Sequence, residues 1–284
     1  MSATGQPPSS DEVAHRVGAL RREWRAFWLA LQFFTRLPTP QFEGFRPEWL
    51  NDAAKWFPAV GLVVGAISAA VMWGAAQVLP VPIAAGLALA AGAVVTGAFH
   101  EDGLADTFDA LGGHVDRAKA LAIMKDSRIG SYGALALVVV TGLRWVALAA
   151  LPLAVAVPAL FAAHALARGG ATALMARLHY VRDEDGKSKP LAVALGAGSL
   201  SVALVTAALP LAALSAWRPP TWPLWAAAAL GVLAVHAFCA RWYRRRLGGF
   251  TGDALGCAEQ LGEAAALLGV VAALPLAASL AVGP

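Results

Sequence analysis

The segment WFPAVGLVVGAISAAVMWGAAQVL, Trp56–Leu79, decides the fold class of this chain. Its 24 residues include no acidic or basic side chain, and a helix of this length can cross a hydrocarbon core of roughly 30 Å. A second apolar segment, 83–99, follows after Val81, which is flanked by Pro80 and Pro82. Because proline interrupts helices, the pattern predicts a tight hairpin of two membrane helices.

The composition extends this prediction to the whole chain. Of its 284 residues, 58% are hydrophobic and only 14% are charged, whereas about a quarter of the residues of a soluble domain are charged. Five more apolar segments predict spanning helices at 133–152, 155–175, 191–214, 222–240 and 264–282. We therefore expect an all-α, polytopic helical membrane protein with about seven transmembrane helices.

The N-terminal region differs from the spanning segments. Residues 1–22 are polar and then basic, so we expect a cytosolic lead rather than a cleaved signal peptide. The apolar stretch Arg25–Leu37 is too short to span and predicts a short interfacial or re-entrant helix. We expect residues 23–284 to form a single helical membrane domain.

The distribution of charge predicts the orientation. Nineteen of the 22 Lys and Arg residues fall in four segments that the topology places on one side: 1–55, 100–132, 176–190 and 241–263. The positive-inside rule makes this side cytoplasmic. All 18 Asp and Glu residues fall on the same side, so we expect no acid within a spanning helix. The prediction is a protein of the bacterial cytoplasmic (inner) membrane, with catalytic cytosolic loops at 100–132 and 241–263.

An acidic stretch, FHEDGLADTFDALGG (Phe99–Gly113), opens the first of these loops. In a helix, Asp102, Asp106 and Asp109 follow an i, i+4, i+7 spacing and fall within an arc of roughly 60°. Glu101 is then turned aside. Carboxylates on one face repel each other unless a cation lies between them, and Mg²⁺ is bound by a few carboxylates together with substrate phosphates. The stretch predicts a metal and phosphate site; a solvated acidic loop is the alternative.

The same loop continues as IMKDSRIGSYG (Ile123–Gly133). Lys125 and Arg128 lie beside Ser127 and near two glycines, a combination that suits phosphate oxygens. Asp126 lies among them. Basic residues next to a spanning helix are also ordinary topology signals, which is the alternative interpretation.

A third polar segment, GGFTGDALGCAEQLGE (Gly248–Glu263), has a similar character. Asp253 lies between glycines, and Gln260 lies between two glutamates at helical spacing. Two acidic, glycine-flanked segments that face one compartment favour a shared site. A helix-capping turn with Asp253 as the N-cap is the alternative.

Two arginines, Arg144 and Arg168, fall within predicted spanning helices. Each costs roughly 2.5–3.5 kcal/mol in hydrocarbon, so both are expected to face the bundle interior and to have partners. His164 lies one turn before Arg168 and shares its face. Substrate phosphate or the acidic cluster are the expected partners; snorkelling or structural pairing is the alternative.

In these motifs the chain resembles the cobalamin synthase family, the adenosylcobinamide-GDP ribazoletransferases. The matching segments also include LQFFTRLPTP (Leu31–Pro40) and WFPAVGLVVG (Trp56–Gly65). The resemblance implies that a hydroxyl of α-ribazole, or of its 5′-phosphate, attacks the diphosphate of adenosylcobinamide-GDP. GMP then leaves, and adenosylcobalamin or its 5′-phosphate is formed in the last steps of nucleotide-loop assembly.

The resemblance also implies roles for the candidate residues, with Mg²⁺ as the cofactor. The expected metal ligands are Asp102, Asp106 and Asp109, with Glu101 as a ligand or a supporting group. Either Asp126 or Asp253 completes the site or acts as general base. The expected substrate contacts are Lys125, Ser127, Arg128, Arg168 and Gln260.

Two alternatives accompany this reading. The stretch Asp102-Gly103-Leu104-Ala105 also resembles the CDP-alcohol phosphotransferases, but Phe99 and Asp106 replace an aspartate and an arginine of that motif. A membrane transporter is a weaker alternative, because transporter sites usually lie near the membrane midplane, whereas the charged motifs of this chain are predicted at its cytosolic side. Membrane lipid is an expected partner, nucleic acid is not, and the sequence is compatible with a homo-oligomer.

Overall fold

The computed structural model describes residues 10–44, 46, 48–181 and 195–282. The described residues contain no β-strand, which confirms the all-α prediction. The helices, in chain order, are α1 (Ser10–Phe34), α2 (Glu48–Ala53), η1 (Ala54–Trp56), α3 (Phe57–Ala75), α4 (Val81–Thr96), α5 (Phe99–Leu111), α6 (Arg117–Ile123), α7 (Ser131–Ala150), α8 (Leu153–Met175), α9 (Ala197–Trp217), η2 (Pro219–Thr221), α10 (Trp222–Arg246) and α11 (Gly252–Val282).

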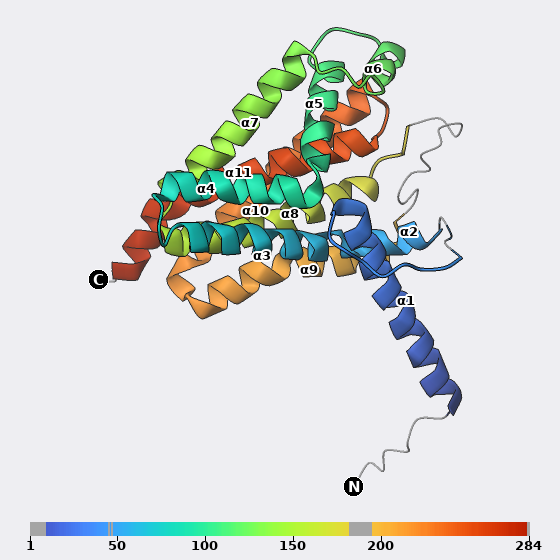
Figure 1. Cartoon of the computed structure of the whole chain (residues 1–284), viewed down its shortest axis with the longest axis horizontal. Coiled ribbons are helices and arrows are strands. Elements are labelled where there is room, and N and C mark those ends of the chain that lie inside the picture. Colours follow the sequence, from blue (N-terminus) through green and yellow to red (C-terminus); the bar gives the residue numbers. More distant parts are fainter. Residues whose placement is uncertain (1–9, 45, 47, 182–194, 283–284) are drawn as a thin grey trace.

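Among the described residues, six helical segments are long and apolar enough to cross a membrane. The bent pair α4–α5 supplies a seventh, which confirms the expected number of about seven. Figure 1 shows these helices as one bundle, with the C-terminus at the end opposite to α5. We call the end that carries α1, α2, α5 and α6 the α5 end. The first residues of the predicted span 191–214 lie outside the described residues.

The predicted α3–α4 hairpin is confirmed, but its second helix ends earlier than predicted. Helix α4 ends at Thr96, and the axis then turns by 90° into α5. Gly97 and Ala98 make this turn with left-handed φ angles of 66° and 57°. Among the described residues, Ala98 is the only non-glycine residue with a positive φ, a conformation that side chains disfavour. The bend directs α5 across the end of the bundle (Figure 1).

Two small residues of α3, Gly61 and Gly65, allow a close approach to α8. A Cβ atom on Gly61 would collide with the backbone of His164, and one on Gly65 would lie 3.0 Å from the Cα of Phe161. Backbones this close are typical of small-residue packing between membrane helices. This contact sets the position of His164 within the bundle.

Helix α1 is longer than the predicted Arg25–Leu37 segment and runs without a break through the expected boundary at residue 22. It leaves the bundle at the α5 end (Figure 1) and is not a candidate span. Glu23 fixes it to the bundle, because its carboxylate accepts hydrogen bonds from Lys55 Nζ at 2.7 Å and Trp56 Nε1 at 3.1 Å. Burial raises the pKa of Glu23, but the contacts with Lys55 and Trp56 and the charge of Arg22 together outweigh it, so the pKa is lowered.

One prediction about the acids was wrong. Helix α11 begins at Gly252, twelve residues before the predicted span 264–282, so Glu259 and Glu263 lie within a spanning helix. Both are 1% exposed. They are tolerated there because each contacts an arginine. The segments 100–132 and 241–263 are accordingly not simple loops, since they contain α5, α6 and parts of α10 and α11.

Candidate active site

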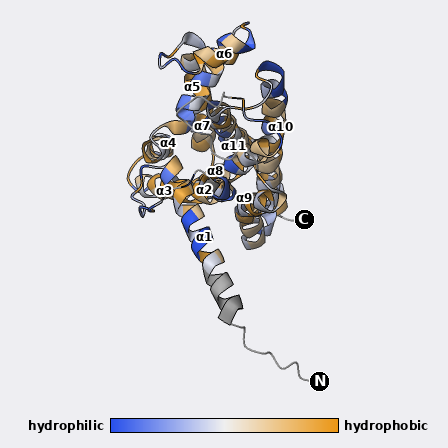
Figure 2. Ribbon diagram, turned by 90° about the vertical axis from the view of Figure 1, so that its right-hand side faces the viewer, coloured by the Kyte–Doolittle hydropathy of each residue, from blue (hydrophilic) through white to orange (hydrophobic). Residues whose placement is uncertain are grey.

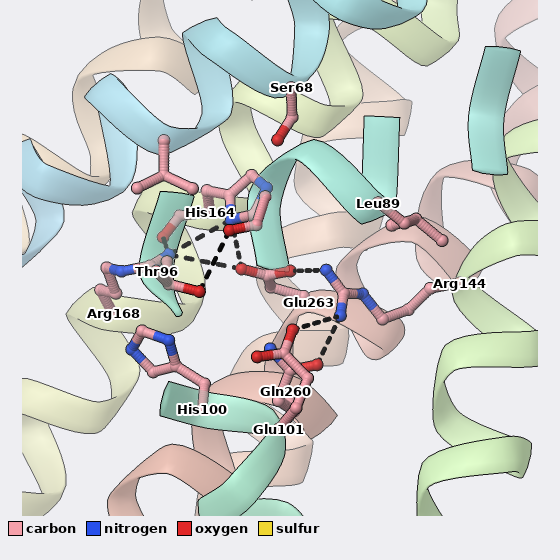
Figure 3. Close-up of a pocket in the computed structure, with 12 residues that line it drawn as sticks. Ser68, Leu89, Thr96, His100, Glu101, Arg144, His164, Arg168, Gln260 and Glu263 are labelled. Atoms are coloured by element: carbon pink, nitrogen blue, oxygen red, sulfur yellow. Dashed lines mark hydrogen bonds and ion pairs between the residues drawn. The ribbon is translucent and has the colours of Figure 1, made fainter. Parts of the chain in front are cut away.

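Helix α5 carries the predicted metal ligands. Asp102, Asp106 and Asp109 lie on this one helix, as their spacing predicted; Asp102 is exposed, and the other two are half-buried. Glu101 is directed into the bundle, where only 19% of its side chain is exposed (Figure 3). The acids of α5 therefore face two environments, one at the surface and one in the interior.

Two arginines fix the C-terminal end of α5 to α10. Arg246 donates hydrogen bonds to the carbonyl oxygens of Leu111 at 3.1 Å and Gly113 at 2.8 Å. In return, Arg117 Nε donates to the carbonyl oxygen of Leu247, just beyond α10, at 2.6 Å. Cationic side chains stabilise the carbonyl end of a helix. Figure 2, which looks onto the α5 end, shows the hydrophilic end of α10 beside this region.

The carboxylate of Asp109 connects α5 to the start of α7. It accepts the backbone N–H of Gly130 at 2.7 Å and that of Gly133 at 2.8 Å. A Cβ atom on either glycine would collide with this carboxylate, so both positions need glycine. The contact brings the motif Ile123–Gly133 against the acidic stretch, as a shared site requires.

The third motif reaches α5 through its glycines. A Cβ atom on Gly103 would lie 2.7 Å from the carbonyl oxygen of Asp253 and 3.2 Å from the Cα of Gly256. The backbones of α5 and α11 therefore touch, which places Asp253 beside the acids of α5. Asp253 is not the N-cap of α11, because the hydroxyl of Thr251 accepts the N–H of Ala254 at 3.1 Å.

Five buried side chains from α7, α8 and α11 contact one another, and we call them the buried network: Arg144, Arg168, Glu259, Gln260 and Glu263. Arg144 donates to Gln260 and Glu263. Arg168 NH1 lies 3.3 Å from Glu263 Oε1 and 2.6 Å from Glu259 Oε1. Gln260 closes the network by donating to Glu259 at 3.0 Å. Each member is at most 4% exposed. Figure 3 shows Arg144, Arg168, Gln260 and Glu263 of this network.

The buried network is electrically balanced. It contains two arginines and two glutamates, so each buried charge has a partner of opposite sign. An unpaired charge at this depth would be strongly destabilising. The arginines thus have partners in the interior, which are the acids of α11 and, for Arg144, also Glu101 of α5. His164 shares a face with Arg168, as predicted, and contacts Glu263.

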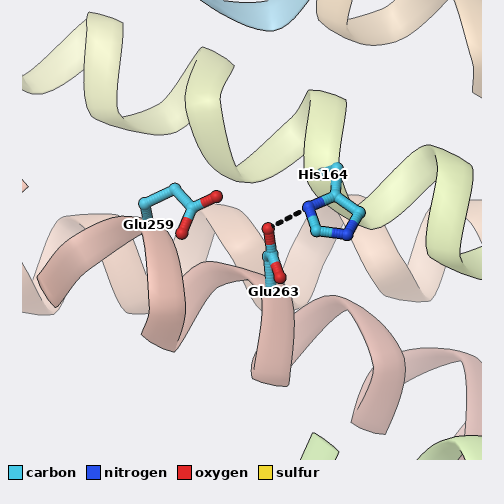
Figure 4. A group of neighbouring side chains, drawn as sticks. All are labelled: His164, Glu259 and Glu263. Atoms are coloured by element: carbon cyan, nitrogen blue, oxygen red, sulfur yellow. Dashed lines mark ion pairs between the residues drawn. The ribbon is translucent and has the colours of Figure 1, made fainter. Parts of the chain in front are cut away.

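One group of the described residues has the geometry of a metal site. Ligand atoms of His164, Glu259 and Glu263 lie within 4.8 Å of one another (Figure 4). However, Arg168 NH1 lies 3.3 Å from His164 Nδ1 and 2.6–3.3 Å from the two carboxylates. The guanidinium therefore occupies the position that a metal cation would take, and we assign this group to the buried network.

A small cavity separates the buried network from α3 and α4. Its volume is about 10 Å³, which is room for roughly one water molecule. Arg168 and Gln260 line it together with Ser68, Thr96 and Glu101 (Figure 3). Because the cavity cannot hold a phosphate group, the structure shows these two predicted substrate contacts bonded within the network instead.

The remaining predicted residues lie at the surface. Lys125, Ser127 and Arg128 are exposed in the segment between α6 and α7. Arg128 NH2 lies 2.6 Å from Asp126 Oδ2, and the hydrogen bonds from Arg128 lower the pKa of Asp126 to about 2. This segment leads directly to Gly130, whose N–H contacts Asp109. The exposed cations are therefore close in sequence to the point where α5 and α7 meet.

Comparisons with known proteins identify the family. A family model described as cobalamin-5-phosphate synthase matches residues 26–271. The chain belongs to this family. The matched range includes every predicted site residue and the whole buried network, and it confirms the resemblance that the motifs indicated. No solved structure matches the chain.

Relatives of the cobalamin-5-phosphate synthase family match most of the chain. A protein of Leptothrix cholodnii named adenosylcobinamide-GDP ribazoletransferase is 52% identical over 260 residues, which cover 90% of this chain and 98% of the relative. Proteins of the same name from Ralstonia nicotianae and Shewanella frigidimarina are each 41% identical. They cover 87% and 88% of this chain, and 95% of each relative is matched.

Sequence reasoning passed over one residue of this family member. His100 is 3% exposed, lines the small cavity and stacks on Phe34 with a ring-centroid separation of 5.3 Å. Its position directly before Glu101 in the acidic stretch was the available signal. Through this stacking Phe34, which belongs to the motif Leu31–Pro40, packs against the start of α5.

Proposed function

We propose that this protein acts as an adenosylcobinamide-GDP ribazoletransferase. It joins α-ribazole or α-ribazole 5′-phosphate to adenosylcobinamide-GDP, releases GMP, and forms adenosylcobalamin or its 5′-phosphate. The relative from Leptothrix cholodnii, matched over 98% of its length, supports this reaction. The observation that carries the proposal is the contact of α5 with α11 at Gly103, which places Asp253 beside the acids of α5.

The reaction is a transfer to an alcohol. Because GMP leaves, the acceptor hydroxyl attacks the phosphorus on the corrinoid side of the diphosphate. A new phosphorus–oxygen bond forms, the bond to the GMP oxygen breaks, and the hydroxyl proton passes to a base. Such a transfer depends mainly on alignment and on neutralisation of phosphate charge. An acidic helix with exposed cations near it fits that requirement.

We propose that Mg²⁺ binds at the acids of α5, Glu101, Asp102, Asp106 and Asp109, whose carboxylates lie apart in the described structure and would have to come together around the ion. Glu101 Oε2 is buried and has no hydrogen-bond partner among the described residues, which is typical of a ligand atom. Arg144 already pairs with Glu263, so its ion pair with Glu101 at 3.9 Å compensates the charge of Glu101 only in part. Asp109 retains lone pairs after accepting two N–H groups. When bound, Mg²⁺ would neutralise the diphosphate oxygens and polarise the bond that breaks.

We assign the base and the phosphate contacts by their surroundings. Asp253 lies in the first turn of α11 against α5 and is the better candidate for general base. Asp126 has a pKa of about 2, which makes it a weak base, and its carboxylate orients Arg128. Lys125, Ser127 and Arg128 are exposed and available to substrate phosphates.

We infer that the protein lies in the bacterial inner membrane with the α5 end in the cytosol. The α5 end carries the basic residues of α6 and of the last turn of α10. At the other end, Arg218 lies between α9 and α10. This asymmetry follows the positive-inside rule. A homo-oligomer in the membrane is compatible with this arrangement.

Release of GMP tests the proposed function directly. Purified protein in detergent receives adenosylcobinamide-GDP and α-ribazole or its phosphate, with Mg²⁺ or with EDTA. We expect GMP and the matching corrinoid product with Mg²⁺ and neither with EDTA. D102N and D106N should lower turnover at least 100-fold, whereas E43Q, which changes an exposed acid outside the site, should retain it.

Each of the other outcomes would reject a different part of the proposal. Turnover of a CDP-linked donor in place of the GDP-linked one would indicate a CDP-alcohol-type phosphotransferase. Full activity of D102N and D106N would reject the metal site but retain the reaction. No turnover of any donor by well-folded protein would reject the enzyme and leave transport to be measured in vesicles.

A further inference from the structure

Arg144 connects the buried network to α5. Its NH1 group donates to Gln260 on α11 and lies 3.9 Å from Glu101 Oε1 on α5. Its NH2 group contacts Glu263, one turn further along α11. Among the described residues, no other member of the buried network has an ion pair with α5. One guanidinium therefore faces three acceptors on two helices.

The position of this guanidinium is fixed from the α11 side. Gln260 and Glu263 hold its two NH groups in one plane, and each is itself held by another member of the network. Arg144 is 4% exposed, so bulk solvent does not reach these contacts. A planar fork with several donors suits this arrangement, whereas a lysine presents all its donors from a single nitrogen and cannot span acceptors on two helices in the same way.

The contact with Glu101 is of a different kind. At 3.9 Å it is too long for a hydrogen bond but short enough for a strong charge interaction in a poorly solvated site. It draws one carboxylate oxygen, Oε1, toward the interior. The other oxygen, Oε2, is left buried and without a partner among the described residues. The carboxylate is thereby held in one orientation with one oxygen unused.

We propose that Arg144 is a positioning residue that orients Glu101 for the metal site. The inference rests on the proposed function, because Glu101 acts there as a metal ligand. Arg144 itself touches neither metal nor substrate. It transmits the fixed geometry of α11 to α5, the helix that follows the bend at Gly97 and Ala98.

A pair of matched double variants tests this role. R144M/E263Q removes one arginine and one glutamate, so Arg168 and Glu259 still balance each other, but Glu101 loses its cation. R168M/E259Q removes the other pair in the same way and leaves Arg144 in place. Both variants leave the net charge of the interior unchanged, and melting in detergent checks that both fold. Mn²⁺ binding measured by electron paramagnetic resonance reports the metal site without any turnover.

We expect the Mn²⁺ dissociation constant to rise at least fivefold in R144M/E263Q and to stay within twofold in R168M/E259Q. The Mg²⁺ concentration for half-maximal GMP release should rise in R144M/E263Q by a similar factor. Saturating Mg²⁺ should restore most of the kcat of that variant, because the ligands themselves are intact. Equal effects of the two double variants, or none in R144M/E263Q, would overturn the role of Arg144.

A different set of results would reject the proposed metal site rather than the role of Arg144. If wild-type protein binds no Mn²⁺, or if E101Q binds it as tightly as wild type, the metal assignment of Glu101 is rejected before Arg144 is considered. If R144M/E263Q does not fold, the single variant R144K serves as the test. It keeps the positive charge but loses the planar guanidinium group. We expect R144K to weaken Mn²⁺ binding at least threefold, and unchanged binding would overturn the inference.

Discussion

The carboxylate of Asp109 on α5 accepts the backbone N–H of Gly133 in the first turn of α7 at 2.8 Å. The same carboxylate accepts the N–H of Gly130. It therefore acts as a cap for α7 that comes from a different helix. Asp109 thereby fixes the start of α7, 21 to 24 residues further along the chain, against α5.

Replacement of Asp109 should separate its structural contribution from metal binding. D109A removes both acceptors and should lower the free energy of unfolding by about 1–2 kcal/mol, the usual cost of losing a helix cap. D109N keeps one carbonyl acceptor and should lose less stability. Melting in detergent measures both. Equal stability of D109A and wild type would contradict the capping role.

The crossing of α5 and α11 should not tolerate a larger residue. In G103A the new Cβ atom would lie 2.7 Å from the carbonyl oxygen of Asp253, so the helices must separate. We expect a loss of about 1–3 kcal/mol in stability, as is usual for overpacking, and at least a tenfold loss of GMP release. G252A is the matched control, because a Cβ atom there meets nothing within 4 Å. Comparable losses in both variants would contradict the close crossing.

The pKa of Asp126 predicts its pH dependence. Its folded pKa of about 2 lies below the ordinary 3.8, so its pairing with Arg128 is fully present above pH 4 and is lost as the pH falls through 2. The carboxylate is therefore ionised throughout the range in which the enzyme can be assayed. We expect D126N to retain at least a tenth of turnover, with an unchanged profile of GMP release between pH 5 and 9. A shifted acid limb in D126N would indicate that Asp126 is the general base.

Arg246 should stabilise the end of α5 more than its exposed neighbour does. R246A leaves the carbonyl oxygens of Leu111 and Gly113 without their cationic donor, which should cost about 1–3 kcal/mol. R245A removes the same charge from an exposed position and should change stability by less than about 0.5 kcal/mol. Melting of both variants in detergent makes the comparison. Equal melting temperatures would contradict the role of Arg246.

Apolar length and proline placement were sufficient to predict the fold class and the number of spans. The helical spacing of Asp102, Asp106 and Asp109 was also readable, because a helix repeats at short range. The interior position of Glu259 and Glu263 was not predicted, because a span predicted from hydropathy is ended wherever an acidic residue occurs. Only the partners on α7 and α8, roughly 90 to 120 residues earlier, make those acids tolerable in the membrane.

The long stretch of sequence between these arginines and their acidic partners also affects how the chain enters the membrane during synthesis. Arg144 and Arg168 leave the ribosome long before Glu259 and Glu263, so α7 and α8 must enter the membrane before their counter-charges exist. The hairpin of α7 and α8 is consequently under-stabilised until α11 is made. We expect the insertion machinery to retain the hairpin of α7 and α8 until α11 arrives. A chain truncated before Glu259 should accordingly be a target of membrane quality control.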